Sequence, residues 1–108
     1  MLFRSVGVTT AKRSSRAPEV PTFAEGGVPG YDVAGWYGIC APAGLPKAVL
    51  AKFNEGLVKV LGSPDMQQKL GDQGIDVASS TPEQFLAYVK TEMVKWSKVV
   101  KDAGLVGE

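Results

Sequence analysis

The chain has 108 residues, a net charge of +1, and ordinary proportions of hydrophobic (44%) and charged (21%) side chains, which suits one small globular domain. It contains no histidine and a single cysteine, Cys40. The commonest general base and metal ligand are therefore missing, and neither an internal disulfide nor a cysteine-rich zinc site can form. The balanced charge argues against a nucleic-acid partner. We expect no metal and no cofactor.

The first residues, MLFRSVGVTT, contain Ser5–Thr10, whose β-branched side chains predict a short strand. They lack the apolar region of about 7–15 residues that a secretory signal requires. As written, the chain is therefore expected in the cytoplasm. Residues 11–16 (AKRSSR) are basic and rich in serine. They could contact phosphate, but no aromatic side chains interleave with the charges, which favours a solvated loop.

The stretch Pro21–Gly44 is rich in glycine and proline. Within it, residues 22–25 predict one helical turn and Pro29-Gly30 predicts a tight turn. Residues 35–41 (GWYGICA) form an aromatic and apolar run bounded by helix breakers, which favours a buried strand. Cys40 is then expected to be a buried structural thiol. Trp36 and Tyr37 would point to opposite faces, so that one packs and the other reaches a cleft.

Beyond residue 45 the patterns are helical. Pro46 suits a helix start, the apolar stripe includes Leu50, Phe53 and Leu57, and Gly62 ends this first helix. Ser63-Pro64 caps a second, shorter helix that ends near Gly74. Residues 75–78 (IDVA) alternate and predict a short strand.

Thr81-Pro82 followed by Gln84 predicts a capping box for a third helix that runs to about Ala103. Its apolar side chains form one stripe and predict a packed face: Phe85, Val89, Met93, Trp96 and Val100.

No group of residues indicates catalysis. Glu83 and Glu92 lie too far apart on the third helix to share a site, and both are expected to be solvated. The glycine-rich residues 26–30 (GGVPG) match neither phosphate-loop nor dinucleotide spacing. We therefore expect that the chain is not an enzyme.

Two long motifs resemble a known family. They are VPTFAEGGVPGY at residues 20–31 and WYGICAPAGLP at residues 36–46, with VGVTTAKRS before them and TPEQF after them. Together they resemble the C-terminal third of the Bug or TctC family, the extracytoplasmic solute-binding proteins of tripartite tricarboxylate transporters. The resemblance runs from about Val6 to Leu105, nearly the whole chain.

The resemblance implies an α/β fold, namely the C-terminal part of a two-lobe fold like that of type II periplasmic binding proteins, helix-rich after residue 45. Residues 1–34 would end the second lobe, and residues 35–108 would supply a crossing strand and the helices that complete the first lobe. The family binds a small carboxylate between the lobes for uptake, delivers it to membrane transporter subunits, and is periplasmic.

Family members are considerably longer, so the resemblance implies that this chain is a fragment lacking the main ligand loops. Residues near the crossing remain as candidate ligand contacts: Thr9, Thr10, Trp36, Tyr37 and Gly38. The alternative is a truncated module that binds no solute and self-associates, as a homo-oligomer, through exposed apolar helix and strand surfaces.

Overall fold

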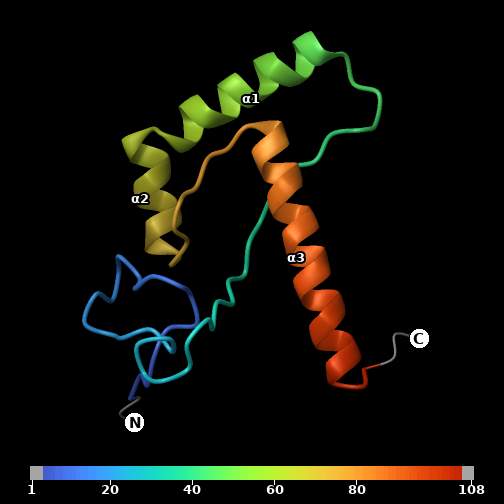
Figure 1. The fold of residues 1–108 in the computed structure, drawn as a ribbon. Coiled ribbons are helices and arrows are strands. Elements are labelled where there is room, and N and C mark those ends of the chain that lie inside the picture. Colours follow the sequence, from blue (N-terminus) through green and yellow to red (C-terminus); the bar gives the residue numbers. More distant parts are fainter. Residues whose placement is uncertain (1–3, 106–108) are drawn as a thin grey trace.

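The computed structural model describes residues 4–105, and its regular structure is helical (Figure 1). Helix α1 (Lys47–Leu61) is followed at once by α2 (Pro64–Asp72), and the long α3 (Pro82–Asp102) ends the described chain. An irregular N-terminal loop, residues 4–34, lies near the free end of α2 in Figure 1. An extended segment leaves this loop, passes α3 and leads into α1.

Local signals account for the ends of the helices. Ser63 Oγ accepts a hydrogen bond from the backbone N–H of Met66 at 3.4 Å, and α2 begins at the next residue, Pro64. Pro46 lies one residue before α1 rather than inside it. Since proline lacks an N–H and has a restricted φ, it suits either position at a helix start.

The predicted capping box of α3 is confirmed. Thr81 Oγ1 accepts from the Gln84 N–H at 3.2 Å, and Gln84 Oε1 accepts from the Thr81 N–H at 2.9 Å. Beyond the helix ends, Gly74 and Gly104 adopt φ values of +76° and +66°, the left-handed conformation that glycine adopts without steric cost.

The three predicted strands are wrong for the described residues. Ser5–Thr10 contributes one isolated parallel bridge, between Val8 and Thr22, and residues 35–41 and 75–78 form no strand. A strand needs a neighbouring chain for its N–H and C=O groups, and within residues 4–105 nothing extends the ladder beyond this bridge. The composition of these segments indicates an extended backbone, but it does not provide the neighbouring strands with which that backbone would form hydrogen bonds.

No hydrophobic side chain is fully buried among the described residues. The chain exposes 9207 Å², whereas a compact protein of this mass exposes about 5,800 Å². Its radius of gyration is 17.3 Å, against about 13 Å for a compact domain of this length. Among the described helices, only α1 and α2 share more than a marginal contact.

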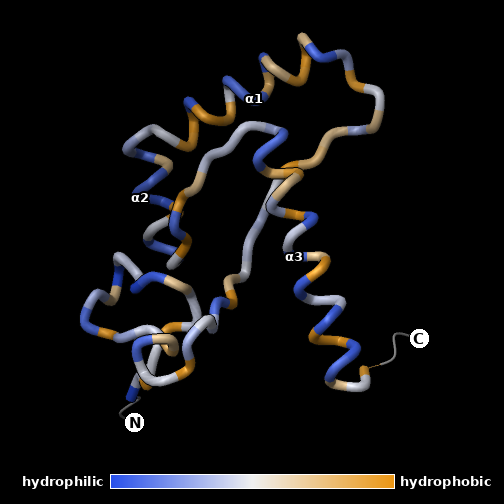
Figure 2. The backbone as a smooth tube through the Cα atoms, viewed as in Figure 1, coloured by the Kyte–Doolittle hydropathy of each residue, from blue (hydrophilic) through white to orange (hydrophobic). Residues whose placement is uncertain are grey.

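Two predictions of burial are therefore wrong. Cys40 is exposed, because the run around it has no covering layer. The apolar stripe of α3 is also largely open, since Met93 is 65% exposed and Trp96 and Val100 are also exposed. Figure 2 shows hydrophobic and hydrophilic residues alternating along each helix, and the helices share too little contact to cover the hydrophobic ones.

The N-terminal loop is held by polar contacts. Arg13 donates to both carboxylate oxygens of Glu25, and Thr22, which is 3% exposed, donates its backbone N–H to Glu25 Oε2 at 2.7 Å. Arg16 pairs with Asp72 of α2 at 3.5 Å. The basic stretch is thus a surface loop whose arginines meet acids of this chain, in agreement with the solvated-loop interpretation. The predicted turns at residues 22–25 and at Pro29-Gly30 are both confirmed.

Candidate functional site

Residues 32–38 cross the side of α3, and this crossing brings together most of the candidate residues. Trp36 makes edge-to-face contacts with Phe85 and Tyr88, at ring-centroid distances of 5.7 and 5.6 Å. Gly38 lies so close to the Phe85 ring that a Cβ there would overlap it. Aromatic pairs with this geometry add roughly 0.5–1.5 kcal/mol each beyond the area they bury. The first turns of α3 therefore hold the crossing segment by aromatic contacts.

A carboxylate lies next to these aromatic rings. Glu92 is 8% exposed and accepts hydrogen bonds from Trp96 Nε1 at 2.9 Å and Lys95 Nζ at 3.2 Å. The hydrogen bond from Trp96, followed by Lys95, holds the pKa of Glu92 below its ordinary value despite the opposing effect of burial. Lys95 also donates to the carbonyl oxygen of Asp32. Glu92 and Lys95 thus connect α3 to the start of the crossing segment.

The prediction that Glu92 is solvated is wrong. The carboxylate lies one turn before Trp96 and three residues before Lys95, so both side chains reach it along the same face of α3. This spacing in the sequence could have indicated a hydrogen-bonded carboxylate. Burial also raises the pKa of the neighbouring Tyr88, with a smaller contribution from the Glu92 charge.

Thr9 and Thr10 lie at the other end of the crossing. The Val33 N–H donates to the Thr9 carbonyl at 2.8 Å, and the Ala11 N–H donates to Asp32 Oδ1 at 3.0 Å. The Thr10 hydroxyl donates to the Lys12 carbonyl at 2.7 Å, within its own turn. The structure therefore places both threonines beside the residues from which the crossing segment starts.

Trp36 and Tyr37 differ in exposure. Trp36 packs on α3 and is 41% exposed, whereas Tyr37 is 86% exposed. The packing of one ring was predicted, and the approach of the other to a cleft stays a prediction. On the crossing segment, Trp36 and Tyr37 are the candidate residues whose side chains can form hydrogen bonds, and Tyr37 is the more exposed of the two. Gly38 has no side chain, and this lets its backbone lie close to the Phe85 ring.

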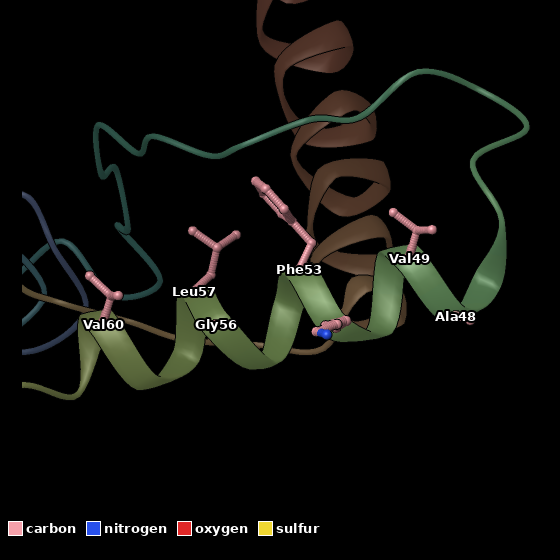
Figure 3. A pocket seen from close by; sticks show the side chains of 7 residues that line it. Ala48, Val49, Phe53, Gly56, Leu57 and Val60 are labelled. Carbon is pink, nitrogen blue, oxygen red and sulfur yellow. The ribbon is translucent and has the colours of Figure 1, made fainter.

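Two surface hollows lie away from the candidate residues. The larger, about 660 Å³, follows one face of α1 and is shown in Figure 3. The smaller, about 250 Å³, lies between the N-terminal loop and the end of α2, where Ser15 Oγ donates to Asp76 Oδ1 at 2.8 Å. Neither hollow is lined by Thr9, Thr10, Trp36, Tyr37 or Gly38.

The contacts at the crossing fix residues 32–38 against α3, and they do not form a catalytic arrangement. Glu92 and Lys95 pair with each other, and Trp36 is held by aromatic contacts. Within residues 4–105 no group of three or more side chains has the arrangement of a metal site. None of the described helices has the length and apolarity needed to cross a membrane.

Comparison with known proteins places this geometry in context. A family model described as "Tripartite tricarboxylate transporter family receptor" matches residues 2–105. A protein from the tcbD-tcbE intergenic region of Pseudomonas sp. is 38% identical over 98 residues, which cover 90% of this chain and 29% of that protein. Protein BugT of Bordetella pertussis is 28% identical over 101 residues, covering 94% of this chain and 31% of its own length.

Two solved structures are similar to the chain. Rpa4515 of R. palustris, solved with adipate, is 38% identical, with a TM-score of 0.77 over 91% of this chain and 33% of that one. The periplasmic binding protein BugD is 34% identical, with a TM-score of 0.78 over 94% of this chain and 35% of its own. The chain thus spans about a third of the length of these relatives.

These similarities confirm the predicted fold class: the chain forms part of a two-lobe α/β fold of periplasmic-binding-protein type, helix-rich after residue 45. They also agree with the expectation that the chain is not an enzyme, since the matching proteins are receptors and binding proteins.

Proposed function

Because the chain belongs to the tripartite tricarboxylate transporter family of receptors, we propose that it forms part of an extracytoplasmic solute-binding protein. The whole protein would bind a small carboxylate and deliver it to membrane transporter subunits. The observation that carries this proposal is the TM-score of 0.77, at 38% identity, with a relative solved with adipate. The family supports a periplasmic site of action for the complete receptor.

The proposed role of the chain in binding centres on the crossing segment. Thr9, which is exposed, and Tyr37, at 86% exposure, have polar groups free to meet a solute. Trp36 and Gly38 position Tyr37 through their contacts with Phe85. The Thr10 hydroxyl already donates within its own turn, so its oxygen remains available as an acceptor.

The division into lobes is part of the same proposal. Residues 1–34 would end the second lobe, and contacts within their described part, such as the pair between Arg13 and Glu25, support this division. Residues 35–108 would cross over and complete the first lobe with the three described helices. The contact between Lys95 and Asp32 lies at this boundary.

A chimera tests the proposal. Residues 6–105 of this chain replace the matching third of the adipate-bound R. palustris relative, and calorimetry measures binding of adipate, succinate and citrate. We expect the chimera to bind a small carboxylate, with Tyr37→Ala weakening binding and Val94→Ala, on the outer side of α3, leaving it unchanged. A folded chimera that binds no carboxylate would contradict the proposal. The chain alone is expected to give no heat, since it spans a third of that relative.

A second candidate is a module that binds no solute and self-associates. The absence of a fully buried hydrophobic side chain among the described residues favours it, since exposed apolar faces associate in water. The molecular mass of the chain in solution distinguishes the two candidates. A folded monomer at high concentration would count against self-association, whether or not a carboxylate binds.

A further inference from the structure

Asp32 connects residues 9–11 of the N-terminal loop to helix α3. Its side-chain oxygen Oδ1 accepts the Ala11 N–H at 3.0 Å, across 21 positions of sequence. Its backbone carbonyl accepts a hydrogen bond from Lys95 Nζ, across 63 positions. Asp32 therefore binds the loop through its side chain and α3 through its backbone.

Asp32 and Val33 together hold the two peptide groups that flank Thr10. The Thr9 carbonyl, on the N-terminal side of Thr10, accepts the Val33 N–H at 2.8 Å. The Ala11 N–H, on its C-terminal side, donates to Asp32 Oδ1. Two adjacent residues thus fix the backbone on both sides of Thr10. The position of the Thr10 side chain therefore depends on where the crossing segment begins.

The Lys95 ammonium has a defined place on α3. It pairs with Glu92 Oε1 at 3.2 Å and lies 5.6 Å from the centroid of the Trp96 ring, within range of a cation–π contact. Since an ammonium group has three donors, Lys95 binds Glu92 and the Asp32 carbonyl at the same time. Its side chain is 33% exposed, so these contacts hold a lysine that is partly withdrawn from water.

The hydrogen bonds form one path from α3 to Thr10. Lys95 holds the carbonyl of Asp32, and the carboxylate of Asp32 holds the peptide group that follows Thr10. We propose that Asp32 is a positioning residue for Thr9 and Thr10, and that Lys95 fixes Asp32 on α3. The role toward a solute rests on the proposed function, whereas the path from α3 does not.

The path also crosses the proposed boundary between the lobes. Thr9 and Thr10 would belong to the second lobe, and α3 would belong to the first. A change in the position of α3 would then move the threonines through Asp32, although α3 itself makes no contact with a solute in this arrangement. This gives Lys95 a role that its place on the helix does not indicate by itself.

Exchange of the Ala11 amide, followed by NMR in the full chain, tests the path without any solute. Lys95→Met removes the donor to Asp32 and keeps a long aliphatic side chain. We expect the Ala11 amide to exchange about threefold faster or more, the scale of one modest hydrogen bond. Lys95→Arg retains donors and should restore slow exchange. Lys98→Met is the matched control, because Lys98 is an exposed lysine of the same helix, and it should leave the exchange unchanged.

Variants of Asp32 separate its side chain from its backbone. Asp32→Ala removes the acceptor of the Ala11 N–H and leaves the carbonyl that Lys95 binds, so it should speed Ala11 exchange. Asp32→Asn retains an acceptor oxygen and should stay near the parent. Adding Lys95→Met to Asp32→Ala should give no further increase at Ala11, because both changes interrupt the same path. Effects that multiply would show independent contacts and overturn the proposal.

Circular dichroism checks that α3 remains helical in each variant. Faster exchange confined to residues 9–11 and 32–33 then indicates a broken path rather than unfolding. Unchanged Ala11 exchange in Lys95→Met, or an equal change in Lys98→Met, would overturn the proposal.

The chimera with the adipate-bound relative extends the test to solute binding. Lys95→Met and Asp32→Ala should each raise the dissociation constant of the bound carboxylate by about threefold or more, with Lys95→Arg and Asp32→Asn near the parent. Equal affinity in all of these variants would overturn the positioning role. A chimera that binds no carboxylate would contradict the proposed function and with it the role toward a solute, while Ala11 exchange still decides whether α3 fixes Asp32.

Discussion

The N-terminal loop and the three helices are stabilised in opposite ways. Residues 4–34 form one isolated β-bridge, yet residues distant in sequence meet there: Arg13 binds Glu25, and Thr9 meets Val33. Helices α1, α2 and α3 have regular hydrogen bonding and well-formed ends, but they share little contact with one another. The loop therefore has tertiary contacts with little secondary structure, and the helices show the reverse.

The crossing segment is where the N-terminal loop meets α3, whereas the loop meets the end of α2 through Arg16 and Asp72. Asp32 accepts from Lys95, and Trp36 lies against Phe85 and Tyr88. The order of the loop relative to α3 depends on these contacts, while the helices depend on their own hydrogen bonds and caps. Variants at the crossing should thus affect the loop and helix α3 unequally.

The largest effect is expected from Trp36→Ala. The change removes two edge-to-face aromatic contacts, and because the ring is 41% exposed we expect a cost of about 2 kcal/mol rather than the larger value of a fully buried tryptophan. Limited proteolysis should cut residues 32–45 faster, while helicity by circular dichroism stays the same. Loss of α3 helicity instead would show that the crossing segment supports the helix.

The next effect is expected from Glu92, compared in two variants. Glu92→Ala removes the acceptor of both Trp96 Nε1 and Lys95 Nζ, whereas Glu92→Gln retains an acceptor for Trp96 and removes the charge. We expect Glu92→Ala to increase amide exchange at residues 32–36 more than Glu92→Gln does. Equal exchange in the two variants would show that the segment depends on the charge of Glu92, which pairs with Lys95, and not on the hydrogen bond that Trp96 donates within α3.

Thr81→Ala should have a smaller effect that stays within the helix. It removes half of the capping box of α3, at a cost of about 1 kcal/mol, and should lower helicity by fraying the first turn. The control is Thr91→Ala, because the Thr91 hydroxyl only donates to the Ala87 carbonyl inside the same helix. Thr91→Ala should keep or raise helicity. Faster exchange at residues 4–34 in Thr81→Ala would contradict the independence of the two regions.

Lowering the pH should have the smallest effect on stability, and this effect should be confined to the N-terminal loop. Hydrogen bonds from Arg13, and then from the Thr22 N–H, lower the pKa of Glu25 to about 2 from its ordinary 4.5. A carboxyl whose pKa is lowered by folding stabilises the fold fully above its ordinary pKa, and this stabilisation is lost as pH falls from about 4.5 toward 2.

The Thr22 amide signal in NMR spectra should report this change. We expect it to shift with a midpoint near the lowered pKa, and Glu25→Gln should abolish the titration. Glu19→Gln, at an exposed acid of the same loop, serves as the control and should leave the midpoint unchanged. A Thr22 midpoint at the ordinary glutamate pKa would contradict the hydrogen bonding of Glu25.

The candidate site was predictable only in part. The alternation of Trp36 and Tyr37 correctly indicated that one side chain packs, since opposite orientation is a local property of an extended chain. The cleft expected for the other side chain stays a prediction. The contacts of Trp36 with Phe85 and Tyr88 join residues about fifty positions apart, and no local pattern specifies such pairs. The burial of Glu92 was missed, although the spacing to Trp96 indicates it in retrospect.

The amino-acid sequence alone determined the three helices, the side-chain caps of α2 and α3 and the glycines at the helix ends, because the hydrogen bonds of a helix and of its cap join residues a few positions apart. Only the tertiary structure decided that residues 35–41 form no strand, that Cys40 is exposed and that Lys95 reaches Asp32. A strand and a buried side chain both need a partner from elsewhere in the chain or from another molecule, and local composition indicates the need for this partner without supplying it.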